Sequence, residues 1–148
     1  MLIEHERLGT RSIPVIHEVE RGAIRRYALA LGLTNAIHYD VEKARVEGYR
    51  DVVAPPTFVV TLLPWNIPGL HLPPAGVLHG EQAFDWSQDS ICAGDRIEVT
   101  GWVADVKTRG GMHIIGIESE GQHVDRGLAF HARAVLIVTE EVEHASRR

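Results

Sequence analysis

The segment from Ala54 to Leu63, with the sequence APPTFVVTLL, constrains the fold most. The two prolines at its start fit the first turn of a helix, where their missing N–H groups leave no hydrogen bond unmade. The residues that follow are apolar on nearly every side, and such a helix is stable only when other elements enclose it. We therefore expect a buried central helix around which the rest of the chain is wrapped.

The part of the chain after this helix predicts an antiparallel sheet that can enclose it. Apolar and polar side chains alternate in four segments, and Gly110-Gly111 marks a hairpin between two of them. We expect the four strands, paired in chain order as a meander, at residues 80–86, 96–106, 112–118 and 127–138, with a turn at residues 120–122.

The part of the chain before the central helix predicts an edge strand and two helices. Residues 12–19 alternate but contain Pro14, which a central strand would not accept. Residues 20–31 have helical periodicity and end at Gly32, and a shorter helix lies between Asp40 and Gly48. The fold class is therefore α+β.

Composition and charge exclude several classes of function. The chain has 148 residues, 45% of them hydrophobic, which is enough to bury a core as a single domain. A net charge of -5 argues against a nucleic-acid-binding surface. No apolar run reaches the ~20 residues that span a bilayer, and the first residues lack the charge pattern of a signal peptide. With Cys92 as the single cysteine, we expect a cytoplasmic protein without disulfides that binds neither nucleic acid nor membrane.

His38 is the first candidate for chemistry. It lies on an irregular segment between two helices, flanked by Asn35 and Asp40. Histidine is the side chain most easily used as an acid or base near neutral pH. The alternative is a histidine that caps a helix or bonds a carbonyl group, and spacing alone favours this structural role.

The other titratable groups give weaker signals. His79-Gly80-Glu81 stands at the start of a strand, either as part of a site or as a turn with a solvated carboxylate, and the turn is slightly favoured. The nine histidines show no metal-ligand spacing, so we expect no metal and no cofactor. Cys92 lacks the companions of a nucleophile, so we expect it to be buried as a small apolar residue.

Several stretches together resemble the MaoC-like hydratase/dehydratases, specifically the FAS1-like dehydratase N-terminal type with the hot-dog fold. The resemblance spans residues 8–138 and is carried by residues 19–28, 35–40, 54–58, 78–84 and 93–95. It implies a single hot-dog domain over residues 1–148, with a frayed tail at residues 139–148. A long central helix would be wrapped by an antiparallel sheet, with dimerisation through the sheets.

The resemblance also implies an activity. The substrate would be a 2-enoyl or 3-hydroxyacyl thioester of coenzyme A or acyl carrier protein, as in fatty acid metabolism, and water would add reversibly across the C2–C3 double bond. The family motif reads Gly-Asp-x-Asn-Pro-(Ile/Leu)-His, in which the Asp and the His position and deprotonate the water. A glycine N–H at the entrance of the central helix polarises the thioester carbonyl.

This chain keeps part of the motif. Its matching residues are Gly32, Asn35, Ile37 and His38. Leu33 replaces the aspartate of the motif, and a leucine can neither orient nor activate water.

The helix entrance also departs from the family pattern. Pro56 replaces the glycine and has no N–H, so the donor would come from Thr57 or Phe58. An incomplete dyad with a Pro-Thr-Phe entrance resembles the non-catalytic half of two-hot-dog hydratases.

Three hypotheses about function follow. The first is a subunit of an R-specific 2-enoyl-thioester hydratase or 3-hydroxyacyl-thioester dehydratase, in a heterodimer with a catalytic MaoC-like subunit that carries the full dyad. The second is a homodimeric hydratase with a variant site centred on His38 and either Asp40 or Glu81. The third is a non-enzymatic module that binds acyl thioesters. A thioesterase would need a carboxylate near the central helix, and residues 55–66 have none.

The expected catalytic residues are His38 and Asn35. The residues expected to bind substrate are Thr57, Phe58, His79, Gly80 and Arg50. Arg50, or alternatively Arg109, would supply a basic patch for an anionic carrier.

Overall fold

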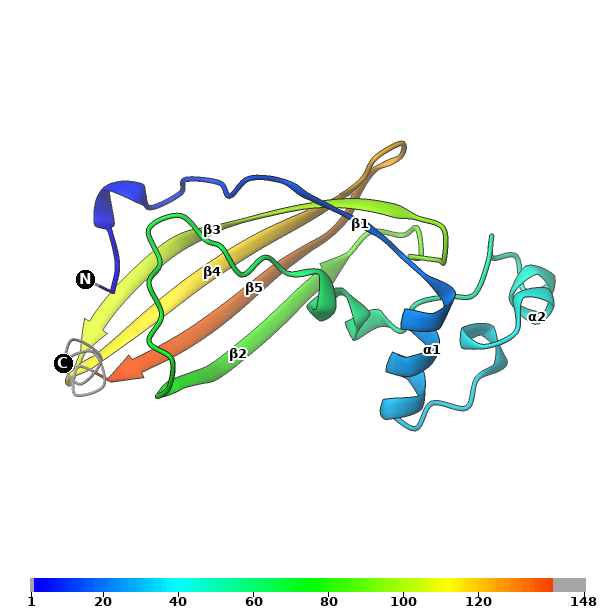
Figure 1. Cartoon of the computed structure of the whole chain (residues 1–148), viewed down its shortest axis with the longest axis horizontal. Helices are drawn as coiled ribbons and strands as arrows, with labels where there is room; N and C mark the ends of the chain where they lie inside the picture. Colours follow the sequence, from blue (N-terminus) through cyan, green and yellow to red (C-terminus); the bar gives the residue numbers. More distant parts are fainter. Residues whose placement is uncertain (1, 140–148) are drawn as a thin grey trace.

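The structure, a computed structural model, describes residues 2–139. It contains one five-stranded antiparallel sheet, and its helices α1, α2 and η2 gather at one end of that sheet (Figure 1). The elements in chain order are η1 (His5–Arg7), β1 (Val15–Glu18), α1 (Arg21–Ala30), η2 (Ala36–His38), α2 (Val41–Val46), η3 (Pro56–Leu62), β2 (Val77–Trp86), β3 (Arg96–Arg109), β4 (Met112–His123) and β5 (Gly127–Thr139). The predicted α+β class is confirmed.

The two N-terminal helices begin and end as predicted. Gly32 follows α1 in a left-handed conformation with φ of 69°, and Gly48 follows α2 with φ of 93°. The side chain of Asp40 accepts a hydrogen bond from the N–H of Lys43 at 3.1 Å and so caps α2. Between these helices, the chain is left with the short irregular segment that carries His38.

The central helix is shorter and tighter than expected. Instead of a long helix, η3 is a 3₁₀ helix of seven residues, preceded by Pro55 and followed closely by Pro64. Three residues per turn place Val59 and Leu62 on the same side, where both are buried. Val60 points away and remains 39% exposed, so the expectation of a helix enclosed on nearly all sides was wrong.

The order of the strands differs from the predicted meander. Strands β3, β4 and β5 pair consecutively, but β2 pairs with β5 at one edge and β1 pairs with β3 at the other. The chain after β2 does not form a tight turn, because the N–H of Ala54 donates to the carbonyl of Ile91 at 2.8 Å and holds this connection against residues 52–54. The connection therefore crosses the end of the sheet and β3 starts on its far side.

The expected turn at residues 120–122 lies inside β4. The strand continues to His123, and the turn is formed by residues 124–126. Gly121 is needed for close packing rather than for a turn, because a Cβ atom at this position would overlap the ring of Phe130. A register shift between Gly121 and Gln122 marks a bulge at the same place.

The buried residues form three core clusters. The largest packs α1 and η3 against the strands, with Ile24, Phe58 and Phe130 among its buried members, and it supports the end where His38 lies. A second, at the opposite end, includes Ile3 and Val138. The smallest consists of Ile37, Ala44, Val53 and Cys92. No helix within residues 2–139 is long and apolar enough to cross a membrane. Of the expected frayed tail, Thr139 belongs to β5 and residues 140–148 lie outside the described residues.

Candidate functional site

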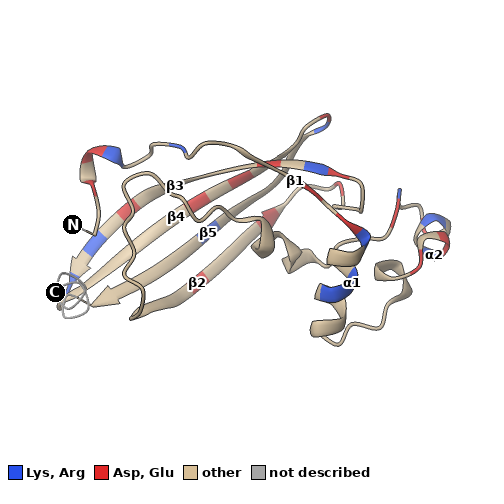
Figure 2. Ribbon diagram, in the orientation of Figure 1, with Lys and Arg blue, Asp and Glu red and all other residues tan. Residues whose placement is uncertain are grey.

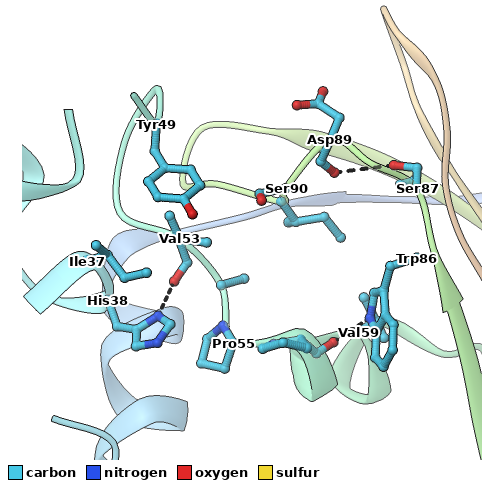
Figure 3. A pocket seen from close by; sticks show the side chains of 14 residues that line it. Ile37, His38, Tyr49, Val53, Pro55, Val59, Trp86, Ser87, Asp89 and Ser90 are labelled. Carbon is cyan, nitrogen blue, oxygen red and sulfur yellow. Dashed lines mark hydrogen bonds between the residues drawn. The ribbon is translucent and has the colours of Figure 1, made fainter. Parts of the chain in front are cut away.

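A cavity of about 460 Å³ lies beside His38, between η2, residues 49–59 and the chain that follows β2 (Figure 3). Its walls are mainly apolar, with a few polar side chains from the connection between β2 and β3. The lining residues are Ile37, His38, Tyr49, Val53, Ala54, Pro55, Pro56, Val59, Trp86, Ser87, Asp89, Ser90, Ile91 and Ala129. We call this the His38 cavity.

The imidazole of His38 is held by the backbone. It is 8% exposed, and its Nδ1 lies 2.6 Å from the carbonyl oxygen of Val53 (Figure 3). A carbonyl oxygen can only accept, so Nδ1 carries the proton and donates it, which leaves a lone pair on Nε2. Within residues 2–139, Nε2 has no hydrogen-bond partner. His38 thus bonds a carbonyl, as the structural alternative predicted, and also lines a cavity.

Neither carboxylate expected beside His38 lies in this cavity. Asp40 caps α2, and Glu81 is close enough to Arg133 to help raise the pKa of that guanidinium, after the larger effect of Asp105. Asp89 does line the cavity, but its carboxylate points away from His38 (Figure 3). The predicted pairing of His38 with either Asp40 or Glu81 is therefore wrong.

The carboxylate of Asp89 is occupied by two guanidinium groups. Its Oδ1 lies 2.9 Å from Nη1 of Arg50 and its Oδ2 lies 3.3 Å from Nε of Arg126. The hydrogen bond from Arg50 lowers the pKa of Asp89, and the charge of Arg126 adds to this. A carboxylate held in this way is a weak base and is poorly suited to activate water.

The segment before His38 is held by local hydrogen bonds. The side-chain oxygen of Asn35 accepts from the N–H of Ile37 at 3.2 Å and caps η2, and the hydroxyl of Tyr39 donates to the carbonyl of Leu33. Arg25 of α1 lies over the Tyr39 ring, 5.6 Å from its centroid. Asn35 therefore has a structural role here, and its catalytic role stays a prediction.

The first residues of η3 limit which backbone N–H group could polarise a thioester carbonyl. Pro56 has no N–H, and the N–H of Phe58 already donates to the carbonyl of Pro55 at 2.9 Å. The N–H of Thr57, in the first turn of the helix, remains as the candidate donor. Its hydroxyl is engaged with the Tyr27 hydroxyl at 2.8 Å. Phe58 itself is buried in the largest core cluster, so its role is packing.

The remaining predicted substrate-binding residues lie elsewhere. His79 and Gly80 are on β2, and His79 lines a second cavity of about 170 Å³ between residues 60–72 and the sheet. Arg50 is engaged in ion pairs with Asp89 and Asp95 and does not line the His38 cavity. Of the predicted site residues, only His38 lines the His38 cavity. Phe58 lies in the core and His79 lines the second cavity, whereas Thr57, Gly80 and Arg50 line neither cavity.

Cations with no ion pair are found on the two helices near His38. Arg21 pairs with Asp51 at 2.7 Å, but Arg25, Arg26 and Lys43 have no carboxylate partner within residues 2–139. Blue segments mark these helices at the end of the sheet that carries the site (Figure 2). They are better placed to attract an anionic carrier than Arg50, which is neutralised, or Arg109, which ends β3 at the opposite end of the sheet (Figure 1).

Sequence reasoning missed most of the polar cavity wall. Tyr49, Trp86, Ser87, Asp89 and Ser90 all line it. Four of them lie at the end of β2 and in the connection after it, where no motif or periodicity is visible. The only sequence signal for this wall was the alternation in the predicted strand at residues 80–86, which placed Trp86 on the same face as Phe84.

Comparison with known proteins identifies the family. The family model described as the FAS1-like dehydratase domain region matches residues 6–128. The chain belongs to this family. A UPF0336 protein from Clavibacter michiganensis subsp. michiganensis is 38% identical over 117 residues, which cover 72% of this chain and 78% of that relative. The resemblance noted in the sequence is confirmed.

Two solved structures share the fold of this member of the FAS1-like dehydratase domain region family. The HadBC (3R-hydroxyacyl-ACP dehydratase) complex from Mycobacterium tuberculosis aligns with a TM-score of 0.70 and 23% identity, covering 84% of this chain and 91% of that one. The ChsH1-ChsH2 complex from the same organism aligns with a TM-score of 0.71 and 16% identity, covering 88% and 85%. The five-stranded sheet with few helices is the expected hot-dog fold.

Proposed function

We propose that this chain is a subunit of an R-specific 2-enoyl-thioester hydratase or 3-hydroxyacyl-thioester dehydratase. Its substrate is an acyl thioester of coenzyme A or acyl carrier protein. A second hot-dog subunit supplies the complete Asp/His dyad, and this chain contributes the His38 cavity, which holds part of the acyl group. The family match supports the general activity, and the site geometry supports the division of labour.

One observation carries the proposal. Among residues 2–139, Nε2 of His38 has no partner beside the apolar cavity that this histidine lines, and no carboxylate is placed there to assist hydration. Hydration removes a proton from water while oxygen bonds to C3, and C2 then takes a proton. Leu33 stands in place of the carboxylate, and Asp89 is neutralised by two arginines. A histidine alone can exchange a proton but cannot also orient the water, so a second subunit has to complete the chemistry.

The free edge of β2 fits a partner subunit. This strand has ten residues and pairs only with β5 within the part of the chain that the structure describes. Leu78 is 63% exposed and Trp86 is 49% exposed on it. Because Trp86 also lines the His38 cavity, a chain that pairs with this edge would border that cavity. Both HadBC and ChsH1-ChsH2 are complexes, which agrees with pairing of two hot-dog chains.

The test is a hydration assay with short and long 2-enoyl-CoA substrates. It compares this chain alone, a hot-dog protein that carries Gly-Asp-x-Asn-Pro-x-His alone, and their mixture. We expect no turnover by this chain alone and more turnover by the mixture than by the partner. Full activity of the purified chain alone, lost in His38→Gln but kept in His79→Gln, would contradict the need for a partner.

One observation also favours a second candidate, the homodimeric hydratase centred on His38. The unpaired Nε2 is suitable for proton transfer without any partner chain. In that case Leu33→Asp should supply the missing carboxylate and raise turnover of the chain alone. Binding of acyl-CoA without turnover in any combination of subunits would instead favour the non-enzymatic module.

A further inference from the structure

A buried carboxylate cluster lies behind the His38 cavity. The side chain of Asp95 is 7% exposed, and its two oxygens lie 2.9 Å from Nη2 of Arg50 and 2.8 Å from Nη2 of Arg126. The N–H of Cys92 donates to it at 2.9 Å. Burying a carboxylate is strongly unfavourable unless it is paired and hydrogen-bonded, so these contacts fix where Asp95 and its partners can lie. With Asp89, which the same two arginines hold, these residues form what we call the Asp95 cluster.

The Asp95 cluster connects three segments that are distant in sequence. Arg50 follows α2, Asp89 and Asp95 belong to the connection between β2 and β3, and Arg126 lies in the turn between β4 and β5. Arg50 also donates to the carbonyl of Ser90 at 3.0 Å. Both arginines therefore hold the β2–β3 connection, one from each side.

The connection held by the Asp95 cluster sets the position of the Val53 carbonyl. Residues 91–93 pair with residues 52–54 through two backbone hydrogen bonds, Ala54 N–H to Ile91 O at 2.8 Å and Ala93 N–H to Val52 O at 3.0 Å. Val53 lies between these two hydrogen bonds, and its own N–H and carbonyl groups point away from residues 91–93.

On that other side, the backbone of Val53 contacts η2. Its N–H donates to the carbonyl of Ile37 at 2.9 Å, and its carbonyl accepts from Nδ1–H of His38 at 2.6 Å. The chain of contacts thus runs from Arg126 through Asp95 and the paired backbones to the ring of His38.

We propose that Asp95 and Arg126 are positioning residues for His38: they hold the carbonyl that selects the Nδ1–H tautomer and so keep the Nε2 lone pair available to the His38 cavity. Neither side chain lines that cavity. The proposal rests on the proposed function only where it concerns turnover, because the tautomer can be measured without substrate. Nothing in the family motif points to Arg126, which lies in a hairpin turn.

The direct test is ¹⁵N NMR of the histidine ring nitrogens at neutral pH, with the His38 signals assigned by their loss in His38→Gln. The wild-type chain should show His38 as a single Nδ1–H tautomer. Arg126→Met should lose this single species and show a mixture of tautomers, and Arg126→Lys, which keeps the charge, should recover most of it. The matched control is Arg133→Met, which breaks a 2.8 Å ion pair between β5 and Asp105 of β3 without touching the Asp95 cluster.

A kinetic test follows in the complex with the second subunit. Arg126→Met should lower kcat about 10-fold with little change in KM, because small misplacements of a reacting group are costly. In the His38→Gln background the same substitution should change kcat by no more than about twofold, since residues that act through one another are not additive.

The outcomes separate the two proposals. A single Nδ1–H tautomer in folded Arg126→Met would overturn the positioning role, whatever the activity. If Arg126→Met does not fold, Asp95→Asn decides in the same way, because it keeps the size of the side chain and removes the charge that pairs with Arg126. Unchanged turnover in His38→Gln together with tautomer loss in Arg126→Met would overturn the proton-transfer role of His38 and still support positioning by the Asp95 cluster.

Discussion

The two buried histidines, His38 and His123, have opposite surroundings. Nδ1 of His38 bonds a backbone carbonyl, and its Nε2, beside a cavity, has no partner among the residues that the structure describes. His123 has Nδ1 at 2.9 Å from Nη2 of Arg126, while its Nε2 is enclosed without a partner in the described chain. Because the guanidinium can only donate, Nδ1 of His123 accepts and its proton is on Nε2. Burial alone therefore does not distinguish the two histidines as candidates for chemistry, whereas contact with a cavity does.

The Asp95 cluster joins the surroundings of the two histidines. Arg126 contacts both His123 and Asp95, and Asp95 holds the backbone that positions His38. Removing Asp95 should therefore disturb the surroundings of both histidines, whereas a change of His123 alone should leave those of His38 intact.

The largest effect is expected from Asp95→Ala. It removes the acceptor of the Cys92 N–H and leaves Arg50 and Arg126 without their shared buried partner. We expect a loss of about 3 kcal/mol in the free energy of unfolding, measured by urea denaturation. The matched control is Asp85→Ala, whose side chain is 91% exposed and should change stability by less than about 0.5 kcal/mol. A similar small change in both variants would show that the two histidine regions are not joined through Asp95.

A smaller effect is expected from Gly121→Ala, two residues before His123. The added methyl group would overlap the ring of Phe130, and overpacking of this kind costs about 1–3 kcal/mol. The control is Gly22→Ala in α1, which should change the free energy of unfolding in the opposite direction. Its added methyl group would meet only the flexible end of Arg26 and should stabilise the helix by about 0.5–1 kcal/mol. Chemical denaturation of both variants measures the difference. Unchanged stability in Gly121→Ala would mean that the bulge adapts freely.

His123 should make stability depend on pH in the mildly acid range. Burial lowers its pKa below the ordinary value of 6.5, and the charge of Arg126 adds to this. As pH falls below 6.5, the unfolded chain takes up a proton before the folded chain does, so stability is lost until the pH reaches the lowered pKa. His123→Leu should flatten this dependence between pH 7 and about pH 5 in thermal denaturation series. An unchanged slope would mean that His123 charges as readily in the folded state as in the unfolded one.

The smallest effect concerns Cys92, which lies between the two histidine regions. It is fully buried, and burial raises the pKa of its thiol. The thiolate is the reactive form, so we expect slow labelling by a thiol reagent in the native state and rapid labelling after unfolding. Labelling of the folded chain as fast as that of the unfolded chain would show that the Val53–Cys92 contact opens readily.

Elements with local signals could be predicted from the sequence. Gly32, Asp40 and Gly48 mark helix ends by their own conformational and hydrogen-bonding preferences, and the alternation in β3 follows from burial of one face. Strand order could not be predicted, because it depends on where the connection at residues 87–95 is anchored. The length of η3 also depends on context, since its bracketing prolines allow either helix type.

The candidate site was predicted in part for the same reason. His38 was singled out because a histidine on an irregular segment can act as an acid or base near neutral pH, and the structure places it beside a cavity. The role of Arg50 was misjudged because its partners, Asp89 and Asp95, are about 40 residues away and no local pattern links them. Arg126 and His123 were missed because strand ends and turns carry no signature of a buried ion pair.

The free edge of β2 has a consequence for handling the protein. An edge strand of this length can pair with any other extended chain, so an isolated copy is prone to precipitate and to be degraded in the cell. Glu81 and Asp85 place negative charges on exposed positions of this edge and oppose pairing between two copies of it. Solubility should therefore improve with co-expression of a partner more than with lower expression temperature, and the two chains would have to be produced in matched amounts.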